Sequence, residues 1–175
     1  MDFEKLILAR QACRKFTDEP VEKEKLEKIA EAGRLAPSAC NSQPWHIHVI
    51  RGEKAAEFSA CLRDFGMNQF TKNVTSFIAV SELNAKLVIG SSLKYDKNHF
   101  VKYDIGEVVA YITLAAEELG VSSCILGWLN NKKIAELLNF ESEEVCNIVI
   151  ALGYSEIAKR EKSRKAFSDV VKWHE

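Results

Sequence analysis

The sequence has little of what marks fibrous, disordered or nucleic-acid-binding chains. It contains three prolines and eight glycines in 175 residues, which excludes a fibrous or linker-rich chain. It also has no excess of either charge, because 24 lysines and arginines face 25 aspartates and glutamates, a net charge of −1. Nucleic-acid binders normally carry a large basic excess, so the balance argues against one, including an RNA binder that uses a basic patch.

Long apolar runs are missing as well. The longest uncharged stretch, residues 35–50, is interrupted by two prolines, an asparagine, a glutamine and two histidines, so we expect no membrane span. The start of the chain is acidic and amphipathic, unlike a signal peptide. These features together predict a cytoplasmic protein.

Cysteines are few and show no paired spacing. The five stand at positions 13, 40, 61, 124 and 146, without a C-x-x-C pair and in odd number. We interpret them as small apolar residues in a reducing compartment. Counting alone leaves open a single cysteine nucleophile with a histidine partner.

The familiar motifs of nucleotide, metal and hydrolase sites are absent too. No G-x-G-x-x-G follows an expected strand, and neither G-x-x-x-x-G-K-[ST] nor H-E-x-x-H occurs. Ser38 does not lie in a G-x-S-x-G elbow, which argues against a hydrolase. His46 and His48 would share one face of a strand, but no third ligand is near in the sequence. We therefore expect packed or hydrogen-bonded histidines and no metal.

Hydrophobic periodicity predicts helices alternating with strands. Asp2 and Asp104 are candidate helix N-caps, and Gly120 is a candidate helix end. Helices are expected at about residues 2–10, 22–33, 55–65, 104–119 and 130–138, strands at 45–50, 74–80, 122–128 and 146–152, and a short helix or edge strand at 167–173. Nothing is assigned to residues 82–102. We expect one domain over residues 1–175, of α+β or α/β class, with one sheet covered by helices.

Two features rise above this background. Arg10, Arg14, Lys162 and Arg164 come from opposite ends of the chain. Each alone is an ordinary surface charge, but together they could converge on a phosphate, whose oxygens match the fork of an arginine. The second feature is the loop of residues 37–45, either a rigid turn into a strand or a surface for a planar ligand, with a serine hydroxyl and an asparagine amide.

The order of these motifs resembles the nitroreductase family of FMN-dependent oxidoreductases. R-x-x-x-R-x-F covers Arg10 to Phe16, and L-A-P-S-x-x-N-x-Q-P-W runs from Leu35 to Trp45. The segments 104–106, 120–128, 151–154 and 162–164 follow in the family's order, so the resemblance covers essentially the whole chain.

The resemblance implies a set of FMN-binding residues. The phosphate and ribityl chain would be held by Arg10, Arg14, Lys162 and Arg164. The isoalloxazine would be contacted, from the other subunit of a homodimer, by Pro37, Ser38, Ala39 and Asn41. Leu126 and Gly127 would lie at the ring, with a backbone N–H of Gly127 directed at N5. Ala12 stands where the family usually has serine, so a main-chain N–H would replace the hydroxyl, and Leu126 replaces an acidic residue of some members.

The implied fold is α+β, with a central mixed, mainly antiparallel sheet flanked by helices, in an intertwined homodimer. We expect the apolar face of residues 105–119 to form the dimer core, because one chain has few elements to cover it. Residues 82–102 are expected to hold what remains of the substrate cover of larger members.

The implied activity is hydride transfer from NAD(P)H through flavin N5 to a small acceptor such as a nitroaromatic or a quinone. The reaction would be ping-pong, because no second nucleotide fold is present. No side chain is assigned as acid or base. Alternatives are an FMN-binding or redox-sensing protein without turnover, and a related flavoenzyme such as a reductive dehalogenase or a flavin-cleaving enzyme.

Overall fold

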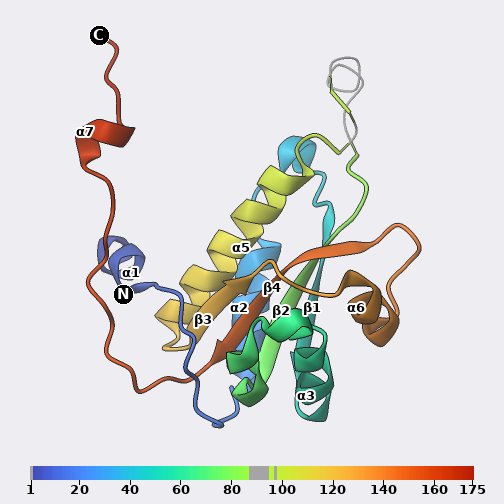
Figure 1. The fold of residues 1–175 in the computed structure, drawn as a ribbon. Helices are drawn as coiled ribbons and strands as arrows, with labels where there is room; N and C mark the ends of the chain where they lie inside the picture. Colours follow the sequence, from blue (N-terminus) through green and yellow to red (C-terminus); the bar gives the residue numbers. More distant parts are fainter. Residues whose placement is uncertain (1, 87–94, 97) are drawn as a thin grey trace.

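A single antiparallel sheet organises the chain in the computed structural model, which describes residues 2–86, 95–96 and 98–175 (Figure 1). The strand order is β1-β2-β4-β3, and all three pairings are antiparallel. The strands are β1 (Trp45–Arg51), β2 (Ser76–Glu82), β3 (Ser122–Leu126) and β4 (Val145–Gly153). One isolated parallel bridge joins Ala12 to Ser123. The α+β class with a mainly antiparallel sheet is thus confirmed.

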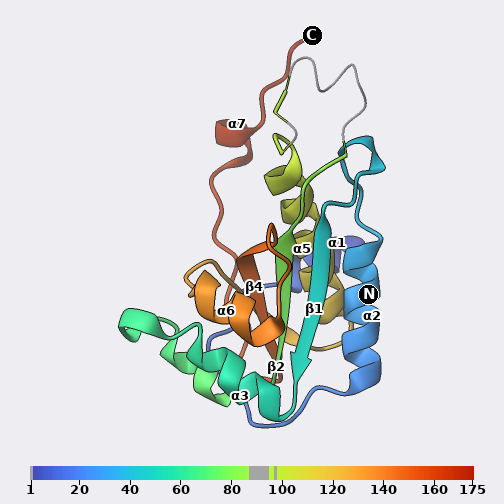
Figure 2. The same ribbon diagram turned by 90° about the vertical axis from the view of Figure 1, so that its right-hand side faces the viewer.

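Helices cover both faces of this sheet (Figures 1 and 2). One face carries α2 (Lys23–Arg34) and α5 (Val101–Glu118), and the other carries α3 (Glu53–Ala60) and α6 (Asn131–Leu138). The remaining elements are α1 (Phe3–Ala9), α7 (Phe167–Val170) and the short 3-10 turns η1 (Ala39–Asn41), η2 (Asp64–Gly66) and η3 (Gln69–Asn73).

Alternation along the two central strands builds a core on each face. In β2, Ile78 and Val80 pack on the side of α2 and α5, whereas Phe77 and Ala79 pack on the side of α3 and α6. Residues of β4 alternate in the same way. Because both faces of β2 and β4 are buried, these strands are almost uncharged, unlike a strand with one face in water.

The helices α2 and α5 approach each other closely at Gly33. A Cβ at this position would lie 2.7 Å from Cγ1 of Ile112, so only glycine allows the contact. The apolar face of α5, including Ile105 and Val108, is buried here against α2 and the sheet. The expectation that residues 105–119 form a dimer core is therefore wrong, because the chain covers this face itself.

The helix α1 ends at Ala9, close to the expected end, so Arg10 and Arg14 follow it outside the helix. Two other helix boundaries differ from the sequence expectations. The helix α5 begins at Val101, which places Asp104 inside its first turn rather than at the N-cap. The helix α3 ends at Ala60, and Phe65, expected on its apolar face, lies in a left-handed turn and is 93% exposed.

Other boundaries follow the sequence signals. Gly120 has a φ of +72° directly after α5, as expected for a helix end. The Asn130 side chain accepts a hydrogen bond from the Lys133 N–H and caps α6. The strand β3 is an edge strand and leaves Ile125 40% exposed, although its sequence is uncharged.

The C-terminal segment runs away from the body of the molecule (Figures 1 and 2). It contains α7, the short helix of the two expected alternatives, and exposes three large apolar side chains, Phe167, Val170 and Trp173. At the sheet, β1 forms the edge opposite β3 and pairs only with β2 within the part of the chain that the structure describes. No helix among these residues is long and apolar enough to cross a membrane.

Candidate functional site

The segment that follows α1 lies in extended form along the edge strand β3. Ala12 pairs with Ser123, and the Cys13 N–H donates to the Ser123 carbonyl at 2.9 Å. Further on, the Phe16 ring lies over Gly153 at the end of β4, so close that a Cβ there would be 2.9 Å from Cδ1 of Phe16. These contacts fix where the segment carrying Arg10 and Arg14 lies on the sheet.

Residues 160–162, which precede α7 in the chain, contact the same segment. The Lys162 Nζ donates to the Arg10 carbonyl at 2.8 Å and also to the Ile7 carbonyl. The Arg160 N–H donates to the Gln11 side chain at 3.2 Å. Residues from the two ends of the chain thus meet beside β3, as the sequence predicted.

Three of the four predicted cations act on one another electrostatically. Burial lowers the pKa of Arg10; the Cys124 thiol opposes this shift, and the neighbouring Arg164 adds to it. The pKa of Lys162 is lowered by burial and by Arg164 and Arg10. The Arg10 Nε is buried without a hydrogen-bond partner among the described residues. This cationic cluster, Arg10, Lys162 and Arg164, forms no ion pair with a carboxylate of the described residues.

Arg14 and Arg10 both act electrostatically on Cys124. Burial raises the pKa of the Cys124 thiol, and the positive charges of Arg14 and Arg10 oppose that rise. Arg14 and Ala12 also line a cavity of about 410 Å³ next to the cluster. The structure thus gathers all four predicted cations and Ala12 into one region.

Several residues that line this cavity were not predicted from the sequence. Its lining includes Ser122, Ser155, Lys159 and Arg160, and Lys159 forms an ion pair with the largely buried Glu117 in the last turn of α5. The sequence signal for Lys159 and Arg160 was the basic run at residues 159–165. From this run only Lys162 and Arg164 were predicted to bind the phosphate. Sequence alone does not reveal which side chains of such a run turn inward.

The loop between α2 and β1 is ordered by its own side chains. The Ser38 Oγ accepts from the Gln43 N–H at 2.9 Å, and the Gln43 Nε2 donates to the Asn41 Oδ1 at 3.1 Å. Cys40, Asn41 and Gln43 all have positive φ values, which are costly for residues other than glycine. The loop is therefore a built structure, as its functional interpretation requires.

Asp104 anchors this loop to the start of α5. Its Oδ1 accepts from the Ala39 N–H at 3.1 Å, while its Oδ2 is buried without a partner among the described residues. The cationic cluster instead lies near the last turn of α5, where Glu117 meets Lys159. Since Asp104 and Glu117 are 13 residues apart, about 20 Å along α5, one chain does not bring the two halves of the predicted flavin site together.

Leu126 and Gly127 lie at the end of β3. The Leu126 side chain is buried in the core beneath α3 and α6, which leaves its backbone for any ligand contact. Gly127 is exposed, and a Cβ there would meet nothing within 4 Å. Residues 87–94 and 97, within the segment expected to cover the substrate, lie outside the described residues.

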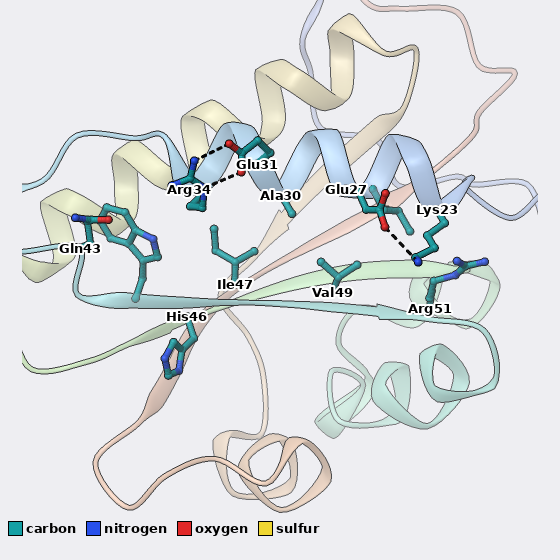
Figure 3. A pocket seen from close by; sticks show the side chains of 12 residues that line it. Lys23, Glu27, Ala30, Glu31, Arg34, Gln43, His46, Ile47, Val49 and Arg51 are labelled. Carbon is teal, nitrogen blue, oxygen red and sulfur yellow. Dashed lines mark hydrogen bonds and ion pairs between the residues drawn. The ribbon is translucent and has the colours of Figure 1, made fainter.

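A second cavity, about 720 Å³, forms a groove between α2 and β1 (Figure 3). Ile47 and Val49 of β1 point into it toward α2, and the ion pairs Lys23–Glu27 and Arg34–Glu31 lie along the helix. Apart from Gln43 and Trp45, which belong to the motif of residues 35–45, its lining lies outside the predicted flavin motifs.

His46 and His48 point away from this groove, to the other face of the sheet, as their spacing predicted. There the His48 Nε2 lies 2.7 Å and the His46 Nδ1 3.2 Å from Oε1 of Glu144. Burial raises the pKa of this carboxyl, but hydrogen bonds from Ser81, His48, the Glu141 backbone and His46 outweigh burial and lower it overall. Glu144 is the third polar partner that sequence reasoning missed.

Known proteins resemble this chain along its length. The model of the nitroreductase family matches residues 7–87 and 65–154. A proposed NADH dehydrogenase/NAD(P)H nitroreductase of Archaeoglobus fulgidus is 34% identical over 86% of this chain and 83% of its own length. An oxygen-insensitive NADPH nitroreductase of Helicobacter pylori is 24% identical over 99% of this chain and 98% of its own.

Solved structures agree with the sequence relatives. A nitroreductase family protein from Streptococcus pneumoniae superposes with a TM-score of 0.84 at 22% identity, covering 99% of this chain and 100% of that one. An FMN-dependent nitroreductase from Clostridium difficile gives a TM-score of 0.77 at 27% identity, with 96% of each chain covered. Since the family model and a relative above 30% identity both span most of the sequence, the chain belongs to the nitroreductase family of oxidoreductases.

Proposed function

We propose that this protein is an FMN-dependent oxidoreductase that passes hydride from NAD(P)H to a small acceptor such as a nitroaromatic or a quinone. The observation that carries the proposal is the cationic cluster. Burial and the charge of Arg164 lower the pKa of Arg10, burial and the charges of Arg164 and Arg10 lower that of Lys162, and the buried Nε of Arg10 has no partner among the described residues. A phosphate would supply the missing negative charge and acceptor atoms.

The residues of one chain fit the phosphate end of FMN. Arg10 and Arg164 would bind the phosphate oxygens, and Lys162, held by the carbonyls of Ile7 and Arg10, would fix the position of this segment. Ala12 and Arg14 line the adjoining cavity, which suits the ribityl chain. When bound, FMN supplies the acceptance and donation of hydride at its N5.

The ring contacts need a second subunit. Pro37, Ser38, Ala39 and Asn41 lie at the far end of α5 from the cationic cluster, so in this proposal they reach the flavin of the other chain in a homodimer. The backbone of Leu126 and Gly127 would face the ring from the first chain. In this arrangement residues 1–175 form one domain, and two flavin sites lie between two copies.

Two open surfaces support this homodimer. The tail exposes Phe167, Val170 and Trp173, and the groove beside the β1 edge is lined by exposed apolar side chains such as Val49. We propose that the tail of one copy lies in this groove of the other. Removal of residues 166–175 should convert a dimer into a monomer in sedimentation. A full-length monomer that holds one FMN would refute the shared site.

Spectroscopy and kinetics test the activity. The purified protein should show a bound flavin spectrum and should oxidise NADH or NADPH in the presence of menadione or a nitroaromatic. Double-reciprocal plots at several acceptor concentrations should be parallel, because donor and acceptor use one pocket in turn. Bound flavin without turnover would instead indicate a redox sensor, and intersecting lines would reject the single pocket.

A further inference from the structure

Three side chains with metal-ligating atoms meet on the sheet face opposite the α2–β1 groove. His46 and His48 come from β1, and Glu144 comes from the residue before β4. One ligand atom from each residue lies within 4.8 Å of the other two. Figure 3 shows the His46 ring directed away from α2, on the side of the sheet that α6 covers.

We propose that His46, His48 and Glu144 form a binding site for a divalent first-row transition-metal ion such as Zn²⁺. Two imidazole nitrogens and one carboxylate oxygen are a common set of three protein ligands for such ions. Around a tetrahedral zinc ion, ligand atoms lie about 3.4 Å apart, given metal–ligand bonds of about 2.1 Å. The distances of 2.7 and 3.2 Å from Glu144 Oε1 to the two imidazole nitrogens need only small side-chain rotations to reach this spacing.

The carboxylate is already held in place by groups outside the ligand set. The Ser81 hydroxyl donates to Glu144 Oε1, and the Glu141 N–H lies 3.3 Å from Oε2. The Phe140 ring packs against His48 with the ring centroids 4.8 Å apart. Such surrounding contacts orient metal ligands and strengthen metal binding, and they are absent from chance pairs of surface side chains.

Exposure gives the site an opening to water. The Glu144 side chain is 3% exposed, His48 is 24% exposed and His46 is 49% exposed. An ion would enter past His46 and retain at least one water ligand. The two imidazoles disfavour Mg²⁺ and Ca²⁺, which prefer oxygen ligands.

The site is independent of the proposed flavin chemistry. It lies on the β1 edge of the sheet, whereas the cationic cluster lies beside β3 at the opposite edge. A bound ion would join β1 to the loop that precedes β4, segments 96 or more residues apart in sequence. Because an unfolded chain does not hold these ligands together, the ion would stabilise the folded state.

Competition with a chromogenic chelator tests the proposal on untagged protein treated with EDTA. Zn²⁺ should bind at one ion per chain with a Kd of about 1 µM or below, and Glu144→Gln and His48→Gln should each weaken binding at least about a hundred-fold. The matched controls are Glu143→Gln, which removes the neighbouring exposed carboxylate, and His99→Gln, which removes a histidine outside the cluster. Both controls should bind zinc like the wild type.

Two further measurements keep the test decisive if a variant folds poorly by circular dichroism. Co²⁺ bound to the wild type should give the visible absorption of a four- or five-coordinate nitrogen–oxygen site. Zn²⁺ should raise the Tm of the wild type and of Glu143→Gln, but not that of Glu144→Gln. The proposal is overturned if the wild type shows no saturable binding up to about 100 µM Zn²⁺, or if the ligand variants and controls bind alike.

Discussion

The two polar clusters at opposite edges of the sheet are built on opposite electrostatic principles. Beside β3, Arg10, Lys162 and Arg164 bring like charges together, and the pKa values of Arg10 and Lys162 are lowered by burial and by these neighbouring charges. Beside β1, a buried carboxylate accepts hydrogen bonds from two histidines and a serine, and its pKa is lowered by them. The positive charges of the first cluster have no carboxylate partner among the described residues. The negative charge of Glu144 in the second cluster is stabilised by hydrogen bonds from residues of the same chain.

This difference separates two kinds of site. A cluster of like charges lowers stability in the free protein and is retained because a ligand of opposite charge completes it. A compensated cluster stabilises the fold even without a ligand. Mutations should therefore have opposite consequences at the two places.

The largest effect is expected on FMN affinity at the cationic cluster. Arg10→Ala and Arg164→Ala should each weaken FMN binding about ten- to hundred-fold, since a charge-assisted hydrogen bond contributes about 1.5–3 kcal/mol. Fluorescence titration measures this loss. Riboflavin, which lacks the phosphate, is the matched ligand, and its affinity should change far less. Equal losses for both ligands would mean that the arginines act on the ring or the fold.

A smaller effect, of opposite sign at the two clusters, is expected for the stability of the ligand-free protein. In EDTA, Glu144→Gln should lower the free energy of unfolding by about 1–3 kcal/mol, because it weakens hydrogen bonds to a buried charge. Arg164→Ala should leave stability unchanged or raise it, because it relieves repulsion with Arg10 and Lys162. Urea unfolding measures both. A clear loss of stability in Arg164→Ala would end the contrast between the clusters.

The smallest expected effect is a pH-dependent change in stability at a third cluster, in which Glu22, Lys25 and Tyr154 meet at the surface. The Tyr154 hydroxyl, the backbone and Lys25 lower the pKa of Glu22 from 4.5 to about 2. Because the folded pKa is the lower one, this contribution to stability is present above about pH 4.5 and is lost as the pH falls toward 2. Water screens the exposed group, so the effect is slight.

Tyr154→Phe tests that assignment. It removes the leading hydrogen bond to Glu22 while keeping the ring, so an NMR titration should find the Glu22 pKa moved back toward its ordinary value. An unchanged pKa in this variant would mean that Lys25 and the backbone alone hold the carboxylate.

Much of the fold could be predicted from the sequence, because its signals are local. The strands expected at residues 45–50 and 146–152 and the helix expected at residues 130–138 depend on neighbouring residues, and each prediction is confirmed. Predictions failed where a distant contact decides the outcome. Asp104 looks like a helix cap in sequence, but it is buried because the loop at Ala39 needs an acceptor for its N–H.

The candidate sites follow the same rule. The cationic residues could be selected because the family motifs mark them, and the structure then brought them together. Glu144 could not be selected, because only the register of β1 on β2 and of β2 on β4 places it beside His46 and His48. The apolar face of α5 was assigned to a partner because the sequence does not show that α2 covers it.

Gly153 has no side chain, yet it determines how closely the N-terminal segment packs on the sheet. The Phe16 ring occupies the space that a Cβ at Gly153 would need, and Arg10 and Arg14 precede this ring on the same extended segment. A methyl group at Gly153 would displace the ring and with it the backbone that carries both arginines. In the proposed flavin site, affinity for FMN would thus depend on Gly153 as well, a position that a catalogue of ligand contacts would omit.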